Sequence, residues 1–449
     1  MHIHLGVEGL LPWSLYVAMW VSFLASAFWT PSLGLYVLAF AIPMQTGRYK
    51  LHTFFLGSEF VDILILGAGL GVIFKGFPIL ERLPANKILI GSSLFLYLSL
   101  WQGALFTSAP LPLWITDPRF SNWKNYIEMF LLALLVISAI RTKHQMHIMI
   151  LIMCLGTLVV NRSYYSLLAD RDLSQFSYEV RDSGLLGYAG VNGFAAFEAM
   201  ILSFLIGFLP AIRQWYLKVG AATVLVSGLY CLLFAFSRGA YIGMLSGMLT
   251  VGMLKRRKYL FFVVLIVLTW QTAMPTSVQQ RIMMTTSGSG DGHFDSSSEE
   301  RLTLWRDALD MFKRNPVTGT GFNTYEYMHR VGPYQDTHNY YLKTLAETGL
   351  LGMGIFLILL KTLLSAGWNL HKSTGDPFYS ALGVGFTAAV ICAIVINFFG
   401  DRWSYQQVDG YLWILFGLVA RSLLVVREAE RHRGSDCPLG LQQEQMLIA

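Results

Sequence analysis

Polar and ionisable side chains are concentrated between Ser297 and Gly352, next to a long apolar segment. Ser297 and Glu300 have the spacing of a capping box, which predicts that a short helix begins there. Pro316 is expected to end this helix. Its apolar face should carry the residues that recur at helical spacing, Leu302, Trp305, Leu309 and Phe312.

Arg301 and Arg238 have surroundings that fit phosphate chemistry. Arginine presents a rigid fork of donors that matches phosphate oxygens and stays charged at ordinary pH. Arg301 would lie in the first turns of its helix, where free N–H groups and the helix dipole also favour anions. The alternative is a surface arginine beside Glu299 and Glu300. Arg238 lies between two apolar segments, where it could either reach solvent or face a lipid phosphate.

His338 is the candidate general base. A second helix is expected to begin with Asp336 or Thr337 as its cap, so that His338 and Asn339 lie in its first turn. A neutral imidazole can accept a proton from a hydroxyl group. The helix dipole and Asp336 would act on its charge in opposite directions. The alternative is an interfacial histidine that hydrogen-bonds a loop carbonyl.

The composition indicates that a membrane protein holds these residues. Of the 449 residues, 54% are apolar and 13% are charged, whereas soluble proteins average about a quarter charged. The net charge of +6 fits anionic lipid and topology better than nucleic acid, because many basic residues flank apolar segments. Membrane lipids are therefore expected as partners, and nucleic acid is not.

Apolar runs predict an all-α, polytopic membrane protein of about twelve transmembrane helices. Some of these runs are too short to cross ~30 Å of hydrocarbon, so half-spans or shifted boundaries are expected. Basic loops predict which helix ends face the cytoplasm, namely Arg141–Lys143, Lys255–Lys258 and Arg421–Arg433. The candidate spans lie near residues 10–28, 33–46, 60–75, 88–106, 125–140, 146–160, 190–209, 217–235, 240–254, 259–273, 346–366, 378–398 and 410–426.

Four regions follow from this topology, with short helices in the second. They are an N-terminal transmembrane bundle (1–273), an extracytoplasmic loop domain (274–345), C-terminal transmembrane helices (346–426) and a cytoplasmic tail (427–449). The N-terminal orientation stays open, because thirteen crossings would place the N-terminus outside and twelve would place it inside.

Each of the other candidate ionisable residues has two possible interpretations. Arg48 would lie outside the cytoplasm, where the positive-inside tendency disfavours it, so either the boundaries differ or the cation serves an anion. Glu198 lies within an apolar run and is either functional or protonated. Asp291, His293 and Asp295 resemble a metal site, but their Gly/Ser-rich surroundings favour disorder.

The order of several motifs resembles the signature region of the O-antigen ligase and polymerase superfamily of membrane glycosyltransferases. The resemblance covers more than a third of the chain, and the combined order is more specific than any single element. The matching residues are Arg181, Gly184, Gly187, Asn192, Ser237-Arg238-Gly239, Arg301, Trp305, Asn315-Pro316, Gly319-x-Gly321, His338-Asn339 and Glu347-x-Gly349.

The resemblance implies a role for each matching site residue, within a fold like that of the GT-C class of glycosyltransferases. It implies catalytic roles for His338, Arg301 and Arg238. Substrate binding is expected from the remaining candidates, Arg181, Asn192, Asn339, Gly319, Gly321 and Arg48. No metal ion or other cofactor is expected if the arginines neutralise the diphosphate.

The implied activity is transfer of a glycan from undecaprenyl diphosphate to an acceptor hydroxyl, on the periplasmic side of a cell inner membrane. An O-antigen ligase would use lipid A-core as the acceptor, whereas a polymerase of O-antigen or exopolysaccharide would use a lipid-linked glycan; a protein acceptor also stays open. A polysaccharide transporter or flippase is the alternative from another class. It would require related halves and coupling groups near the bilayer midplane, and the sequence shows no such repeat.

Overall fold

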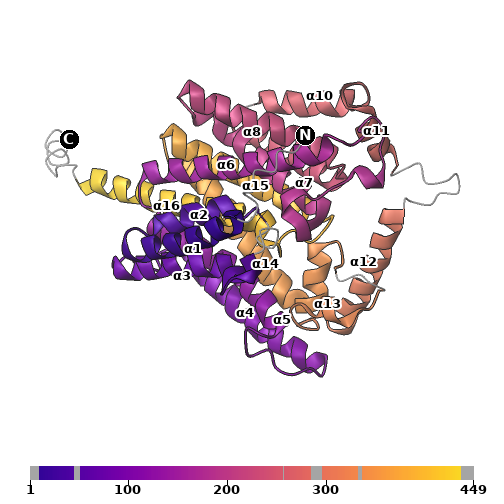
Figure 1. The fold of residues 1–449 in the computed structure, drawn as a ribbon, viewed down its shortest axis with the longest axis horizontal. Helices are drawn as coiled ribbons and strands as arrows, with labels where there is room; N and C mark the ends of the chain where they lie inside the picture. The colour runs from indigo at the N-terminus through magenta and orange to yellow at the C-terminus, as the bar shows by residue number, and fades with distance from the viewer. Residues whose placement is uncertain (1–9, 45–50, 256, 285–295, 332–335, 436–449) are drawn as a thin grey trace, which may run out of the picture.

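Every regular element that the computed structural model describes is a helix, over residues 10–44, 51–255, 257–284, 296–331 and 336–435 (Figure 1). The expected all-α fold class is therefore confirmed. The helices are α1 (Leu10–Phe28), α2 (Ser32–Ala41), α3 (Phe60–Phe74), α4 (Pro84–Phe106), α5 (Pro118–Ala139), α6 (Lys143–Leu168), α7 (Gly190–Phe208), α8 (Trp215–Phe234), α9 (Arg238–Leu254), α10 (Lys258–Ala273), α11 (Thr276–Met283), α12 (Ser296–Arg314), α13 (Thr324–Met328), α14 (Tyr340–Lys372), α15 (Pro377–Ile396) and α16 (Gln406–Ser435).

Eight helices in the described part of the chain are long and apolar enough to cross a membrane. A ninth is added if α10 and α11, which are bent by 105°, count as one span. The expected count of about twelve is not confirmed. The physical reasons are short length and polarity: α2 has 10 residues and α9 has 17, while α5 carries Lys124 and Glu128 in its first half.

Helices α7, α15 and α16 form the centre of the bundle. In their apolar stretches, 78% of the residues of α7 and of α15 and 89% of those of α16 are buried. α15 packs against α7, α9 and α14, and α16 packs against α5. One hydrophobic core therefore joins helices from the N-terminal and C-terminal parts of the chain. The division into four regions stays a prediction.

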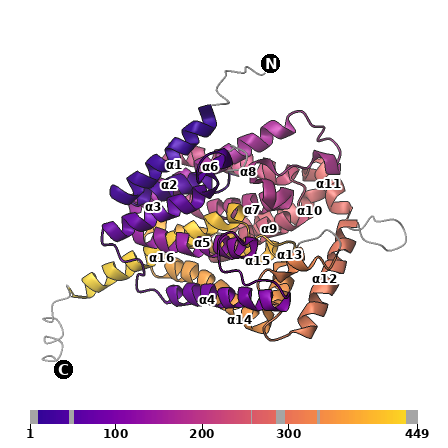
Figure 2. The ribbon, with the colours of Figure 1, turned by 60° about the horizontal axis from the view of Figure 1, so that its bottom comes forward.

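Helix α12 runs along the outer edge of the molecule in both views (Figures 1 and 2). Its buried residues are Leu304, Ala308 and Met311, which pack against α13 and α14. The prediction of the apolar face was therefore wrong: the buried face of α12 is shifted by about one residue along the helix. Leu309 is 38% exposed, and the other three expected residues, Leu302, Trp305 and Phe312, are half-buried. The tertiary partners of α12, rather than its own pattern, set its buried face.

The basic residues expected to face the cytoplasm meet partners at one end of the bundle. Arg421 Nη1 contacts Glu81 at 2.8 Å, and Arg141 contacts the same carboxylate at 3.9 Å. In the neighbouring loops, Lys143 pairs with Asp376 at 2.6 Å. α9 runs from Arg238 to this end, so about 25 Å of helix separates its first residue from the basic loop.

Candidate functional site

The turn between α8 and α9 directs Arg238 toward α12. Phe236 in this turn has a φ of +52°, and α9 begins two residues later at Arg238. Arg238 Nη2 donates a hydrogen bond to Ser298 Oγ at 3.5 Å, in the first turn of α12. Arg301 follows Ser298 by one helical turn and therefore lies on the same face. The structure thus brings two of the predicted catalytic residues close together.

Arg181 and Asn192, which were both predicted to bind substrate, are also in contact. Arg181 Nη2 donates to Asn192 Oδ1 at 2.9 Å. Arg181 Nε is buried and has no hydrogen-bond partner among the described residues. Burial, together with the nearby positive charge of Arg281, lowers the pKa of Arg181 from 12.5 to about 10. A desolvated cation beside another cation favours the binding of an anion.

Arg281 in α11 connects the two arginine sites and was missed by sequence reasoning. Its side chain is buried, at 3% exposure. Nε donates to the Phe236 carbonyl at 3.3 Å, next to Arg238, and Nη1 donates to the Tyr178 hydroxyl at 3.2 Å, near Arg181. Its guanidinium also lies 4.9 Å from the centre of the Phe176 ring. Four arginines therefore surround the start of α9.

His338 pairs with Asp336. Nδ1 lies 3.1 Å from Asp336 Oδ2, and the His338 backbone N–H donates to Asp336 Oδ1 at 3.1 Å. His338 has a φ of +52°, a conformation that residues other than glycine seldom adopt, and Asp336 holds it there. Burial would raise the pKa of Asp336, but the His338 hydrogen bond and the charges of Lys343 and Arg402 lower it to about 2.

The Asp336 carboxylate decides the tautomer of a neutral His338. An ionised carboxylate can only accept a hydrogen bond, so His338 Nδ1 must carry the hydrogen. Nε2 then carries the lone pair. This is the arrangement that a histidine general base needs.

The loop between α15 and α16 lies between the histidine and the arginines. On one side, the Tyr340 N–H donates to the Asn397 carbonyl at 3.0 Å. On the other side, Gly239 of α9 faces Phe399, where an added Cβ would lie 2.8 Å from the Phe399 Cβ. Arg402 in this loop is buried, at 8% exposure, and donates to the Ala189 carbonyl at 3.3 Å. Its charge also acts on Asp336, so Arg402 is a second site residue that sequence reasoning missed.

The predicted glycines and Asn339 have structural contacts. Gly319 and Gly321 have φ of +68° and +114°, and a Cβ on either would overlap backbone, that of Glu347 in α14 or that of Gly103 in α4. Asn339 Oδ1 caps α14 by accepting from two backbone N–H groups, at 3.0 and 3.1 Å. Their roles in substrate binding stay predictions.

Three other predictions are not part of this site. Arg48 lies outside the described residues, as do Asp291, His293 and Asp295. Glu198 is fully buried in α7, next to Gly228 of α8. No hydrogen bond or ion pair joins Glu198 to the four arginines in the described part of the chain. The site therefore consists of two neighbouring parts: the arginines around the start of α9, and the His338–Asp336 pair at the start of α14.

A family model matches part of the chain. Residues 221–357 match the family model described as O-Antigen ligase. The matched range extends from α8 into α14 and includes Arg238, Arg281, Arg301 and His338. No curated protein matches the chain at a significant level. Over residues 221–357, the chain is therefore similar to the O-antigen ligase superfamily.

Proposed function

We propose that this protein is a glycosyltransferase that moves a glycan from undecaprenyl diphosphate to an acceptor hydroxyl, on the periplasmic face of an inner membrane. The observation that carries the proposal is the cluster of arginines beside an oriented histidine. Within that cluster, Arg181 makes no ion pair in the described part of the chain, and its Nε has no hydrogen-bond partner there. The match to the O-antigen ligase family supports a reaction of this class.

The arginines would hold the diphosphate of the donor. Arg238 and Arg301 approach from α9 and α12, and Arg181 approaches from the segment before α7. When the bond between the anomeric carbon and the phosphate oxygen breaks, its electron pair stays on the diphosphate. Fixed guanidinium groups stabilise this developing charge, which can lower the barrier by several kcal/mol.

His338 would activate the acceptor. Its Nε2 takes the proton of the acceptor hydroxyl while that oxygen forms the new bond to the anomeric carbon. Asp336 accepts the Nδ1 hydrogen and stabilises the imidazolium that results. Attack from the face opposite the departing diphosphate inverts the anomeric configuration.

Reconstitution with a lipid-linked glycan and candidate acceptors tests the proposal. We expect His338→Ala to lower turnover by ~10²–10⁴-fold and Arg301→Ala or Arg238→Ala by ~10²–10³-fold. Arg301→Lys should also lose activity, because a single ammonium does not reproduce a bidentate contact. Arg306→Ala, which changes an exposed arginine of α12, is the matched control. Full turnover in the first three variants would disprove the catalytic assignment.

The same assay separates the two family activities. A ligase joins the glycan to lipid A-core, whereas a polymerase joins it to a second lipid-linked glycan. We favour the ligase activity, because the matched family model is that of an O-antigen ligase. Product analysis with each acceptor supplied alone decides between them. Turnover should continue in the presence of a chelator, since arginines neutralise the diphosphate; loss that Mg²⁺ or Mn²⁺ restores would contradict this.

A further inference from the structure

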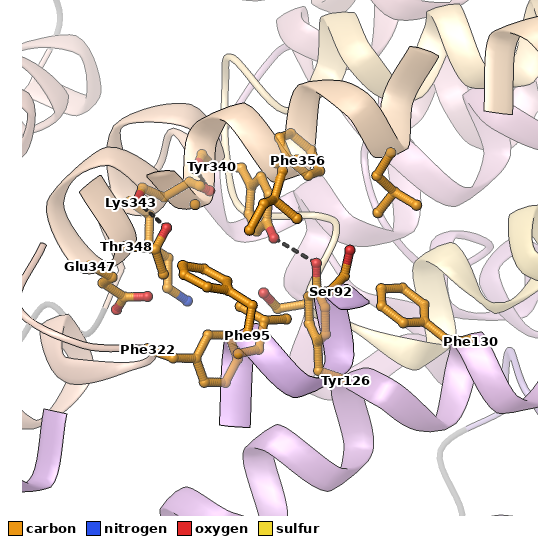
Figure 3. A pocket seen from close by; sticks show the side chains of 16 residues that line it. Ser92, Phe95, Tyr126, Phe130, Phe322, Tyr340, Lys343, Glu347, Thr348 and Phe356 are labelled. Carbon is orange, nitrogen blue, oxygen red and sulfur yellow. Dashed lines mark hydrogen bonds between the residues drawn. The ribbon is translucent and has the colours of Figure 1, made fainter. Parts of the chain in front are cut away.

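A cavity opens beside the start of α14, between this helix, α4 and α5. It encloses about 500 Å³, including the part open to solvent. Figure 3 shows Lys343 and Glu347 at one end with Phe95 and Phe322, and Phe130 at the other end. Tyr340, two residues after His338, forms part of its wall. The cavity is therefore lined by a residue that is two positions from the candidate base in the chain.

The charged groups of the cavity are already matched by protein partners. Lys343 Nζ lies 2.8 Å from Asp401 Oδ2, and this is the one contact of its ammonium group among the described residues. The two Glu347 oxygens accept from the backbone N–H groups of Asn323 and Tyr325, both at 3.0 Å. Because the ion pair is internal, the cavity favours an uncharged ligand over an ion. The ammonium group of Lys343 still has N–H donors to offer.

Hydroxyl groups of the cavity are positioned for a polar ligand. The Tyr126 and Tyr340 hydroxyls lie 2.8 Å apart (Figure 3). Ser92 lines the cavity with 3% exposure, and its Oγ has no hydrogen-bond partner among the described residues. A hydroxyl buried without a partner is costly. A ligand that hydrogen-bonds Ser92 would remove this cost.

We propose that this cavity binds one uncharged pyranose ring of the acceptor glycan, an inference that rests on the proposed function. A pyranose has C–H faces that pack on aromatic rings and a rim of hydroxyls that need donors and acceptors. Phe95, Phe322 and Phe356 provide such rings, while Ser92 and Lys343 provide the polar groups. An alkyl chain would leave the Ser92 hydroxyl unsatisfied.

The position of the cavity assigns it to the acceptor rather than the donor. The acceptor hydroxyl must attack from the side opposite the diphosphate, with His338 next to it. α9, which carries Arg238, packs on α7, α10 and α15, whereas α4 packs on α5 and α14. The cavity and Arg238 thus lie beside different sets of helices. A ring seated here would place its hydroxyl beside the base.

Binding is tested without catalysis by saturation-transfer NMR on the protein in lipid nanodiscs. The probes are methyl α-D-glucopyranoside, methyl α-D-galactopyranoside and methyl α-D-mannopyranoside, with methyl α-D-glucuronide as the anionic counterpart. We expect transfer to at least one neutral glycoside and less to the anionic one. Ser92→Leu, which fills the cavity, should abolish this transfer. Ser93→Leu, the same change at a neighbouring residue outside the lining, should keep it.

Kinetics provide the second test, for which Tyr126→Phe is the milder variant. We expect both Ser92→Leu and Tyr126→Phe to raise the KM for the acceptor by about tenfold. The KM for the lipid-linked donor should stay within about twofold of wild type. Glycoside binding that persists in Ser92→Leu, or an unchanged acceptor KM in both variants, overturns the inference. If glycosides bind in a Ser92-dependent way but no transfer occurs, the cavity assignment stands and the proposed reaction fails.

Discussion

Asp336 fixes which nitrogen of His338 can act as a base. Asp336→Asn can also donate to Nδ1, which would stabilise the tautomer with the lone pair on the wrong nitrogen. We therefore expect kcat to fall by ~10²–10⁴-fold. Because its pKa is about 2, Asp336 stays ionised above about pH 4, so it contributes no limb to the pH–rate profile of the wild type in that range.

The affinity for donor lipid serves as the control for Asp336→Asn. Asp336 interacts with His338, not with the arginines around α9, so the binding of the donor should change by less than about threefold. A variant that keeps the wild-type kcat would show that Asp336 only stabilises the loop.

The lowered pKa of Arg181 predicts that this buried cation destabilises the ligand-free protein. Its pKa falls on folding, from 12.5 to about 10, so the folded state binds this proton less strongly than the unfolded state. Below about pH 10 both states remain protonated, and the cost is therefore constant between about pH 6 and pH 9. Arg181→Met should raise the Tm of the ligand-free protein by about 2 °C throughout this range.

The lipid-linked donor should raise the Tm of the wild type but not that of Arg181→Met. Differential scanning fluorimetry in detergent, with and without donor, measures both effects. Arg162→Met, at an exposed position of α6, should change neither. A lower Tm combined with a normal response to the donor would contradict an anion site at Arg181.

Sequence reasoning pointed to candidate residues that belong to a recognisable pattern and passed over those that do not. His338 and Arg238 were chosen because they belong to the order of motifs that resembles the O-antigen ligase and polymerase superfamily. Arg281 and Arg402 have no such pattern. They hydrogen-bond carbonyl groups that lie far away in the chain, 45 residues from Arg281 and 213 residues from Arg402. Only the packing of the helices reveals those contacts.

At the level of elements, the break in α14 depends on one glycine. Gly349 has a φ of +61°, and a Cβ there would overlap the carbonyl of Val317. Gly349→Ala should therefore destabilise the protein by about 3 kcal/mol and lower the yield of folded protein. Thermal unfolding followed by size-exclusion chromatography measures this loss.

Gly354 provides the matched control on the same helix. A Cβ on Gly354 meets nothing within 4 Å, so Gly354→Ala should be neutral or stabilise the protein by up to about 1 kcal/mol. Equal loss of folded protein from both variants would show that the close contact at Gly349 does not explain the effect.

The helices were predictable because each depends on an apolar run that is visible in the sequence. Every apolar segment that the sequence indicated coincides with a helix, from α1 to α16. Their exact ends and buried faces were less predictable. The helix expected to begin with Asp336 or Thr337 as its cap begins instead at Tyr340, because the Asn339 side chain caps it. His338 has a φ of +52° and therefore lies just before the helix, not in its first turn. Contacts with other helices shifted the buried face of α12.

At the scale of the whole molecule, the basic loops and the candidate site lie at opposite ends of the same helices. α9 carries Arg238 at one end and is followed by Lys255 at the other. α14 begins beside His338 and ends with His371 and Lys372. The part of α14 that follows the break at Gly349 and ends at Lys372 is about 35 Å long, enough to cross the ~30 Å hydrocarbon core of a bilayer.

The separation of the basic loops from the candidate site predicts the orientation of the protein in the membrane. Because basic loops are retained in the cytoplasm, we expect the site to face the periplasm. In a variant with the four cysteines replaced, His329→Cys should react with a membrane-impermeant maleimide in right-side-out vesicles. Both His329 and Lys372 are exposed, but Lys372→Cys should react only after the membrane is permeabilised. The reverse pattern would place the arginines in the cytoplasm and contradict transfer to a periplasmic acceptor.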